Sequence, residues 1–246
     1  IQEGGALIIH TGLEMKANVS PGVKVYEYSL DKGDFHASNI KIDNGTITFD
    51  LVSPIENVEN VELGNPVPIN IENAIAAMAM AQLNGCTAQE LRYGMATYKG
   101  VERRFDFYIK NDRHVLLSDY AHHPNEIYHS ARSIRQLYQN RKITAIFQPH
   151  LYTRTRDFYK EFADALSQLD EVILCDIYPA REEPIPGVTS KLIYDNLKEG
   201  VEKSLISKDE VIELVKERDF DVLIVLGAGD LDNQVPQIAN IIEAKQ

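Results

Sequence analysis

The stretch VLLSDYAHHPNE, residues 115–126, decides the fold. Its apolar start predicts a buried strand, and the polar residues DYAHH (119–123) predict a loop at the carboxyl end of that strand. The residues PNE (124–126) predict that a helix starts directly afterwards, because proline suits a first helical position. The same order of apolar run and polar cluster recurs in residues 143–156 and 172–183.

Strands and helices alternate throughout residues 103–246. Apolar runs at 115–118, 143–147, 171–175 and 222–226 are separated by amphipathic segments. This alternation predicts an α/β fold: a doubly wound, mostly parallel sheet with helices on both faces. In such sheets ligands bind at the carboxyl ends of the strands, where the polar clusters are expected.

Residues 1–99 have a different pattern. Residues 1–62 are β-rich, with short strands expected at 6–9, 23–28 and 46–52. A buried helix is expected from Asn73 to Leu83, and a capping box at Thr87–Glu90 predicts a second helix. The change of pattern predicts a boundary near Lys99, with one domain of strands and helices over 1–99 and a second domain over 100–246.

Composition narrows the class of protein. The net charge of −12 argues against a nucleic-acid surface, which needs a basic patch. No apolar run is long enough to span a bilayer and no signal peptide is visible, so a cytoplasmic location is expected. Cys86 and Cys175 both stand in apolar segments and are predicted to be buried free thiols.

The cluster Asp119, His122 and His123 has several interpretations. These side chains could bind a metal or exchange protons with a substrate, or they could merely cap the following helix. A closed zinc site is disfavoured, because neither cysteine is near in sequence and no His-Glu-x-x-His spacing occurs.

Arg154 and Arg156, close to His150, suit a carboxylate or phosphate ligand. Cations in the first turn of a helix oppose its dipole, and a bound anion would relieve that conflict. The pair Arg103-Arg104, taken alone, is more typical of an ordinary surface.

Two further motifs favour structural roles. GAGD (227–230) has no third glycine and no following Lys-Ser/Thr, so it predicts a tight strand-to-helix turn. Asn70 and Asn73 stand at the start of the apolar helix, where N-capping is the favoured interpretation and reading of a base edge is the alternative.

Taken together and in this order, six motifs resemble the Mur ligases. They are INIENAIAAMA (69–79), GVERRFDF (100–107), LSDYAHHPNEI (117–127), FQPHLYTRTRDF (147–158), DIYPAREEPIPGVTS (176–190) and LGAGD (226–230). The resemblance is strongest over 100–230. Within the family it is closest to the alanine-adding member, because Tyr120 is expected there, whereas the murein-peptide-recycling ligase usually has Phe.

The resemblance implies an ATP- and magnesium-dependent ligase of peptidoglycan synthesis, serving cell-wall biogenesis, cell shape and cell division. Such enzymes join L-alanine to UDP-N-acetylmuramate through an acyl phosphate. Residues 1–99 resemble the end of the central ATPase domain and 100–246 the C-terminal domain. The UDP-binding domain and the phosphate loop are not in this sequence, so the chain alone is expected to be inactive.

Site residues follow from the resemblance motif by motif. Asn70 and Asn73 are expected at adenine, Arg104 at the ATP phosphates and Asp119 at the ribose. The site of the alanine and the acyl phosphate is expected to be lined by Tyr120, His122, His150 and Arg154. Of these, His122 is expected to be the catalytic residue.

One position departs from the family pattern. Leu151 stands where the family often has an arginine that helps to grip the amino-acid carboxylate. Arg181 follows the next strand, so we predict that it supplies the second cation. The alternative is that Arg181 pairs with Glu182 or Glu183 at the surface.

Two functions outside ligation remain as alternatives. One is a metal-dependent hydrolase that uses Asp119, His122, His123 and His150. The other is a non-catalytic interaction module, which predicts no saturable binding of nucleotide or amino acid. For the ligase the expected partners are small molecules, with no nucleic acid and no membrane, and no metal ligand is expected within this chain.

Overall fold

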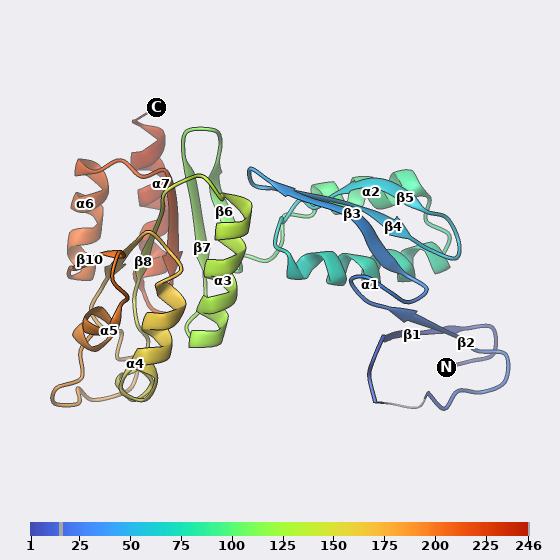
Figure 1. The fold of residues 1–246 in the computed structure, drawn as a ribbon, viewed down its shortest axis with the longest axis horizontal. Helices are drawn as coiled ribbons and strands as arrows, with labels where there is room; N and C mark the ends of the chain where they lie inside the picture. Colours follow the sequence, from blue (N-terminus) through green and yellow to red (C-terminus); the bar gives the residue numbers. More distant parts are fainter. Residues whose placement is uncertain (15–16, 246) are drawn as a thin grey trace. The chain divides into compact units, whose positions relative to one another are not determined.

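The computed structural model describes residues 1–14 and 17–245 and forms two compact units, Ile1–Lys99 and Gly100–Gln246 (Figure 1). We call them the N-terminal unit and the C-terminal unit. Each has its own sheets and helices.

The C-terminal unit is built on one six-stranded sheet. Its strand order is β10-β9-β8-β11-β7-β6, and every neighbouring pair is parallel except β6 with β7. The predicted doubly wound, mostly parallel sheet is thereby confirmed. The strands are β6 (Asp106–Lys110), β7 (Val115–Asp119), β8 (Ile143–Phe147), β9 (Glu171–Leu174), β10 (Glu202–Leu205) and β11 (Val222–Leu226).

Helices cover both faces of this sheet (Figure 1). On one face α3 contacts α4 and α4 contacts α5, and Phe162 of α4 packs on Phe147 of β8. On the other face α6 and α7 enclose a core with Leu116, Ile146 and Leu223. The helical elements are α3 (Pro124–Leu137), α4 (Tyr152–Leu166), α5 (Lys191–Asn196), η1 (Lys208–Glu210), α6 (Val211–Glu217), η2 (Leu231–Gln234) and α7 (Val235–Glu243).

Burial explains why these strands read as continuous apolar runs. All five residues of β7, of β8 and of β11 are buried. A parallel strand covered on both faces has no solvent side, so its sequence need not alternate. The three polar clusters follow the carboxyl ends of β7, β8 and β9.

The described residues of the N-terminal unit, 1–14 and 17–99, form two small sheets and two helices. Strands β1 (Ala6–His10) and β2 (Lys24–Tyr28) pair in parallel. The antiparallel sheet has the order β3-β4-β5. Its elements and the two helices are β3 (His36–Asp43), β4 (Thr46–Val52), β5 (Val58–Glu62), α1 (Ile69–Leu83) and α2 (Ala88–Thr97).

Local signals in this unit are confirmed at the turns and caps. Asn44 and Gly45 both have positive φ, 38° and 77°, as a two-residue hairpin turn between β3 and β4 requires. Gly85 has φ 87° just past the end of α1. Thr87 and Glu90 form the predicted capping box, with Glu90 N donating to Thr87 Oγ1 over 3.3 Å.

Several predictions need correction. Strands β3, β5, β6 and β10 were not predicted, because their mixed sequences carry no clear alternation. Cys175 is buried as predicted, but Cys86 is exposed in the turn between α1 and α2. Helix α1 begins at Ile69, with Pro68 as its N-cap and no side-chain cap, so the N-capping interpretation of Asn70 and Asn73 is wrong.

No helix among the described residues is long and apolar enough to cross a bilayer.

Glu171, at the amino end of β9, lies at the centre of a cluster of charged side chains. Its carboxylate is buried and accepts hydrogen bonds from Arg218 Nη2 over 2.8 and 2.9 Å, with Lys142 Nζ 3.2 Å away. Burial acts to raise the pKa of Glu171, but the bonds from Arg218 and Lys142 outweigh it and hold the pKa below its usual value. The ionised carboxylate therefore stabilises the folded state.

We expect Glu171→Gln to lower the free energy of unfolding by about 1.5–3 kcal/mol at pH 7. Since the folded pKa is depressed, this stabilisation is present above the ordinary value of 4.5 and is lost as the pH falls through the folded pKa. Urea titrations at pH 7 and in acid should show the deficit shrinking. Glu202→Gln is the matched control, because Glu202 also pairs with Lys142 but is 64% exposed. An equal loss in both variants would contradict the role of burial.

Candidate functional site

The candidate site lies where β7, β8 and β9 end. Backbone hydrogen bonds tie the loops there together: Tyr120 N donates to Arg103 O over 2.8 Å, and Leu151 N donates to Tyr178 O over 2.9 Å. Parallel strands bring their carboxyl ends to one edge of the sheet. The three polar clusters that the sequence singled out therefore meet within the C-terminal unit.

Tyr120 directly follows β7 and is half-buried under two cations. The guanidinium carbons of Arg103 and Arg104 lie 4.7 and 5.3 Å from the centre of its ring. Arg103 Nε is also paired with Asp232 at 2.7 Å, whereas Arg104 is exposed. The Tyr120 ring thus holds the guanidinium of Arg104 by a cation–π contact. Because Arg104 is exposed, its positive charge can still pair with an anion.

His122 has a defined orientation. Its Nδ1 lies 2.8 Å from the carbonyl oxygen of Tyr120, and a carbonyl can only accept, so Nδ1 carries a proton. In the neutral ring Nε2 is then the unprotonated nitrogen. The backbone at this point is fixed as well, because the Glu126 carboxylate accepts from the amides of His122 and His123 over 3.0 and 3.1 Å. His122 therefore presents a proton-accepting nitrogen.

His150 follows β8 and lies beside His122, with 5.9 Å between the ring centres. Burial, then the charges of Arg154 and His122, hold the pKa of His150 below its ordinary value of 6.5. A neutral ring can accept, and its Nδ1 lies 3.4 Å from Arg154 Nη1. The ring of Tyr178 stacks on that of His150, with 5.6 Å between the ring centres. His150 is thus a neutral imidazole near neutral pH.

The two arginines of the TRTR segment behave differently. Arg154 is half-buried in the first turn of α4, and its Nη1 also lies 3.4 Å from His122 O. Arg156 is exposed and paired with Asp157 at 2.7 Å. Residues two apart on a helix point in nearly opposite directions, so Arg156 points to solvent while Arg154 lies beside the histidines. That Arg154 binds an anion stays a prediction.

Strain accompanies this turn. Leu151 has φ 75° and ψ 134°, a conformation that a branched side chain rarely adopts. Arg103 and Ala180, in the flanking loops, also have positive φ, 60° and 52°. Such outliers gather where the surrounding structure over-determines a functional geometry.

Arg181 lies in the loop after β9 and is exposed. Among the described residues it has no hydrogen bond or ion pair, and its neighbour Glu182 is instead bound to Thr153 at the start of α4. Pairing of Arg181 with Glu182 or Glu183 is not observed. Its role as a second cation stays a prediction.

Asp119 is held by its own chain. The carboxylate is 7% exposed and accepts from Ser130 Oγ and, over 3.3 Å, from Ala121 N. Burial raises its pKa above the ordinary 3.8, while the bonds from Ser130 and Ala121 oppose the shift. The proposed contact with a ribose stays a prediction, and the observed contacts anchor the 119–123 loop to α3.

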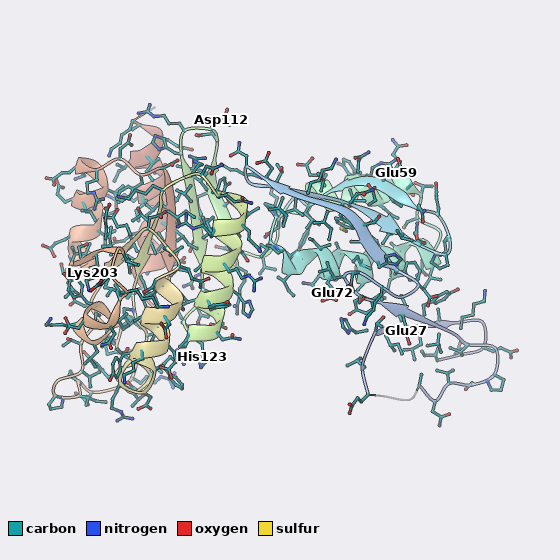
Figure 2. The ribbon with its side chains drawn as sticks, in the orientation of Figure 1. Glu27, Glu59, Glu72, Asp112, His123 and Lys203 are labelled. Atoms are coloured by element: carbon teal, nitrogen blue, oxygen red, sulfur yellow. The ribbon has the colours of Figure 1, made fainter. Side chains whose placement is uncertain are left out.

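We expect Asp119→Asn to raise the urea midpoint of the chain at pH 7. The folded pKa is raised, so the stability linked to this group is present below pH 3.8 and is lost as the pH rises through the folded pKa. An asparagine oxygen can still accept from Ser130, so the gain should vanish in acid. The control is Asp112→Asn in the exposed turn between β6 and β7 (Figure 2). A lowered midpoint at pH 7 would show that the carboxylate stabilises the fold.

Asn70 and Asn73 lie in the first turns of α1 in the N-terminal unit. Asn73 Nδ2 donates to Asn70 Oδ1 over 3.3 Å, and Asn70 Nδ2 donates to Asn65 O over 3.3 Å. Asn73 is exposed, and among the described residues its amide oxygen accepts no hydrogen bond. The assignment of these two asparagines to a base stays a prediction.

Sequence reasoning missed two residues of this site. Arg103 was assigned to an ordinary surface, yet it covers Tyr120 and binds Asp232. Tyr178 was not singled out, although it stands in the third polar cluster beside a proline. An aromatic residue within the polar segment that follows a parallel strand was the available signal.

The four residues of the hydrolase alternative do not converge. Asp119 faces Ser130, and His123 is exposed at the start of α3, with its ring 5.3 Å from that of Phe158 (Figure 2). Among the described residues no group of three or more His, Cys, Asp or Glu side chains is arranged to hold a metal ion.

The C-terminal unit is thus an α/β unit with imidazoles and guanidinia at the ends of its parallel strands, the edge at which such sheets bind ligands. The family model described as "Mur ligase, glutamate ligase domain" matches residues 103–229, and the chain belongs to the Mur ligase family.

Individual relatives carry one name. The chain is 62% identical over 245 residues to the UDP-N-acetylmuramate–L-alanine ligase of Phocaeicola vulgatus, covering 100% of this chain and 54% of that protein. It is 50% identical to the protein of the same name from Parabacteroides distasonis, covering 98% and 52%. The chain thus spans about half the length of the curated relatives it matches.

The fold agrees with solved structures. The UDP-N-acetylmuramate–alanine ligase MurC of Thermotoga maritima superposes with a TM-score of 0.72 at 23% identity, covering 90% of this chain and 48% of that one. At 23% identity, this likeness shows the fold alone.

Proposed function

We propose that this chain is part of an ATP-dependent ligase that joins L-alanine to UDP-N-acetylmuramate in peptidoglycan precursor synthesis. The observation that carries the proposal is the group of His122, His150 and Arg154 beside Arg104 at the strand ends. The names of the relatives supply the substrates. The location that suits this reaction is the cytoplasm.

The site residues divide the work of amide formation. Arg154 binds the alanine carboxylate, because a guanidinium pairs well with a carboxylate in a partly desolvated site. His122 Nε2 takes a proton from the alanine ammonium, which leaves a nucleophilic amine. The amine attacks the acyl carbon, a C–N bond forms, and the C–O bond to phosphate breaks.

ATP supplies the phosphoryl group that turns the muramate carboxylate into an acyl phosphate. Arg104 suits the phosphates, because it is exposed and held over Tyr120. Asn70 and Asn73 suit adenine, and Asp119 is assigned to the ribose. Magnesium belongs with the phosphates, and its ligands are expected outside this chain.

Specificity for alanine rests on Tyr120, His150 and Arg181 with Arg154. A murein-peptide-recycling ligase of the same family remains the second candidate, and Tyr120 is the residue that favours the alanine-adding ligase over it. The metal-dependent hydrolase finds no support in the geometry, since Asp119 and His123 turn away from the histidine pair.

The decisive experiment assays the full-length protein for alanine- and ATP-dependent phosphate release with UDP-N-acetylmuramate. Formation of the alanyl product supports the proposal. Product only with a peptide in place of alanine would support the recycling ligase. The 246-residue chain, assayed beside it, is expected to give no product, because positioned cations and backbone donors around the phosphates supply most of the stabilisation in phosphoryl transfer.

A further inference from the structure

The turn Gly227–Asp230 lies directly against Gln148. Gln148 follows β8, two residues before His150, and is 3% exposed. A side chain at Gly229 would collide with the amide of Gln148, and a Cβ atom at Gly227 would lie 2.6 Å from Gln148 O. These two glycines are therefore required because Gln148 crosses the turn, and they need no phosphate to explain them.

Both ends of the Gln148 amide are used. Nε2 donates to Asp230 Oδ1 over 2.9 Å, and Oε1 accepts from Leu231 N over 3.0 Å. Asp230 Oδ2 is paired with Lys208 Nζ at 2.6 Å. A carboxylate only accepts and a backbone N–H only donates, so an amide at position 148 satisfies both partners and a carboxylate would not.

The same segment also holds the other side of the candidate site. Asp232 accepts from Ser118 Oγ over 2.7 Å and pairs with Arg103, which covers Tyr120. Gly227 N donates to Asp119 O over 3.1 Å. Strand β11 runs between β7 and β8, so the segment that follows it contacts the loops after both.

We propose that Gln148 and Asp230 are positioning residues, which hold the 148–151 turn so that His150 keeps its place beside His122. The inference rests on the proposed ligase function for its kinetic effect. Among the described residues, the hydrogen bonds and ring contacts of the His150 imidazole are with His122, Tyr178 and Arg154, not with Gln148 or Asp230. They act through the backbone that joins Gln148 to His150, whose strained Leu151 needs such support.

The first test uses the full-length protein. Gln148→Glu removes the donor to Asp230 and sets two carboxylates against each other. We expect kcat to fall at least about tenfold with the KM for ATP nearly unchanged, because small displacements of reacting groups are costly. In the double variant Gln148→Glu/Asp230→Asn the amide and the carboxylate exchange places, so both hydrogen bonds can form again. Its kcat should return to within about threefold of wild type.

Gln139→Glu is the matched control, since it makes the same chemical change at an exposed residue of the same unit. Unchanged kcat in Gln148→Glu would overturn the proposal, and so would a loss that the exchange leaves in place. If Gln148→Glu does not fold, the kcat of the double variant Gln148→Glu/Asp230→Asn is the test of the proposal. Near-normal kcat supports the proposal, and a loss of about tenfold or more overturns it.

A second test needs no ligase activity. In the 246-residue chain, NMR titration of the histidine rings should show a changed pH midpoint for His150 in Gln148→Glu and recovery in the exchanged pair. His114, which is buried and bonded to Phe220 O over 2.8 Å, serves as the internal reference. An unchanged His150 titration overturns the inference. Absence of ligase activity in the wild-type full-length protein would instead sink the proposed function, and the titration separates the two failures.

Discussion

Replacing His122 by glutamine should reduce the kcat of the full-length ligase roughly a hundredfold to ten-thousandfold, with smaller changes in KM. Glutamine has a similar size and can still donate to Tyr120 O, but it has no nitrogen that takes up a proton at neutral pH. The alanine ammonium would then have to lose its proton to water. Steady-state rates of phosphate release with alanine at saturation measure the effect.

His123→Gln is the control for this prediction. The two histidines are adjacent, yet His123 is exposed against Phe158 while the His122 ring faces His150. We expect His123→Gln to stay near the wild-type rate. Equal losses at both positions would argue against His122 as the base and would revive the hydrolase alternative, which uses both.

Replacing Arg154 by alanine should raise the KM for L-alanine about ten- to a hundredfold, equivalent to about 1.5–3 kcal/mol. The lost contact is a charge-assisted hydrogen bond to a carboxylate in a half-buried place. The KM for ATP should stay nearly constant, because Arg154 lies beside His150 and not beside a residue assigned to ATP. Initial rates at varied alanine and fixed ATP give both constants.

Two other arginines sharpen this result. Arg156→Ala should leave both KM values nearly unchanged, because Arg156 is exposed and paired with Asp157. Arg181→Ala should raise the KM for alanine at least about tenfold, about 1.4 kcal/mol, if Arg181 is the second cation. No change there would leave Arg154 as the single grip on the carboxylate.

Local signals in the sequence predicted most elements of the C-terminal unit. The apolar runs at β7, β8, β9 and β11 are buried on both faces, and Pro124 starts α3 as expected. These features depend on neighbouring residues along the chain, which a sequence displays directly. The edge strands β6 and β10 escaped prediction, because they are partly exposed and their pairing depends on a partner distant in sequence.

The candidate site shows the same division. The segments DYAHH (119–123) and QPHLYTR (148–154) predicted polar groups at strand ends. The structure brings His122 and His150 of these segments together. It also separates Arg154 from Arg156, pairs Arg103 with Asp232 and stacks Tyr178 on His150. Propensity and periodicity carry no information about the contacts of His122 with His150, Arg103 with Asp232 and Tyr178 with His150, because each contact joins residues from different loops.

What the sequence by itself determined is which segments form the buried central strands of the C-terminal unit and which chemical groups follow their carboxyl ends. What the tertiary structure alone decided is the strand order, which inserts β11 between β7 and β8. Strand order follows from how the connecting helices pack on the two faces, and that packing is a property of the whole domain. Because β11 lies there, GAGD contacts Gln148 and Asp119 and acts in the structure as a support between two loops, a role that its sequence does not reveal.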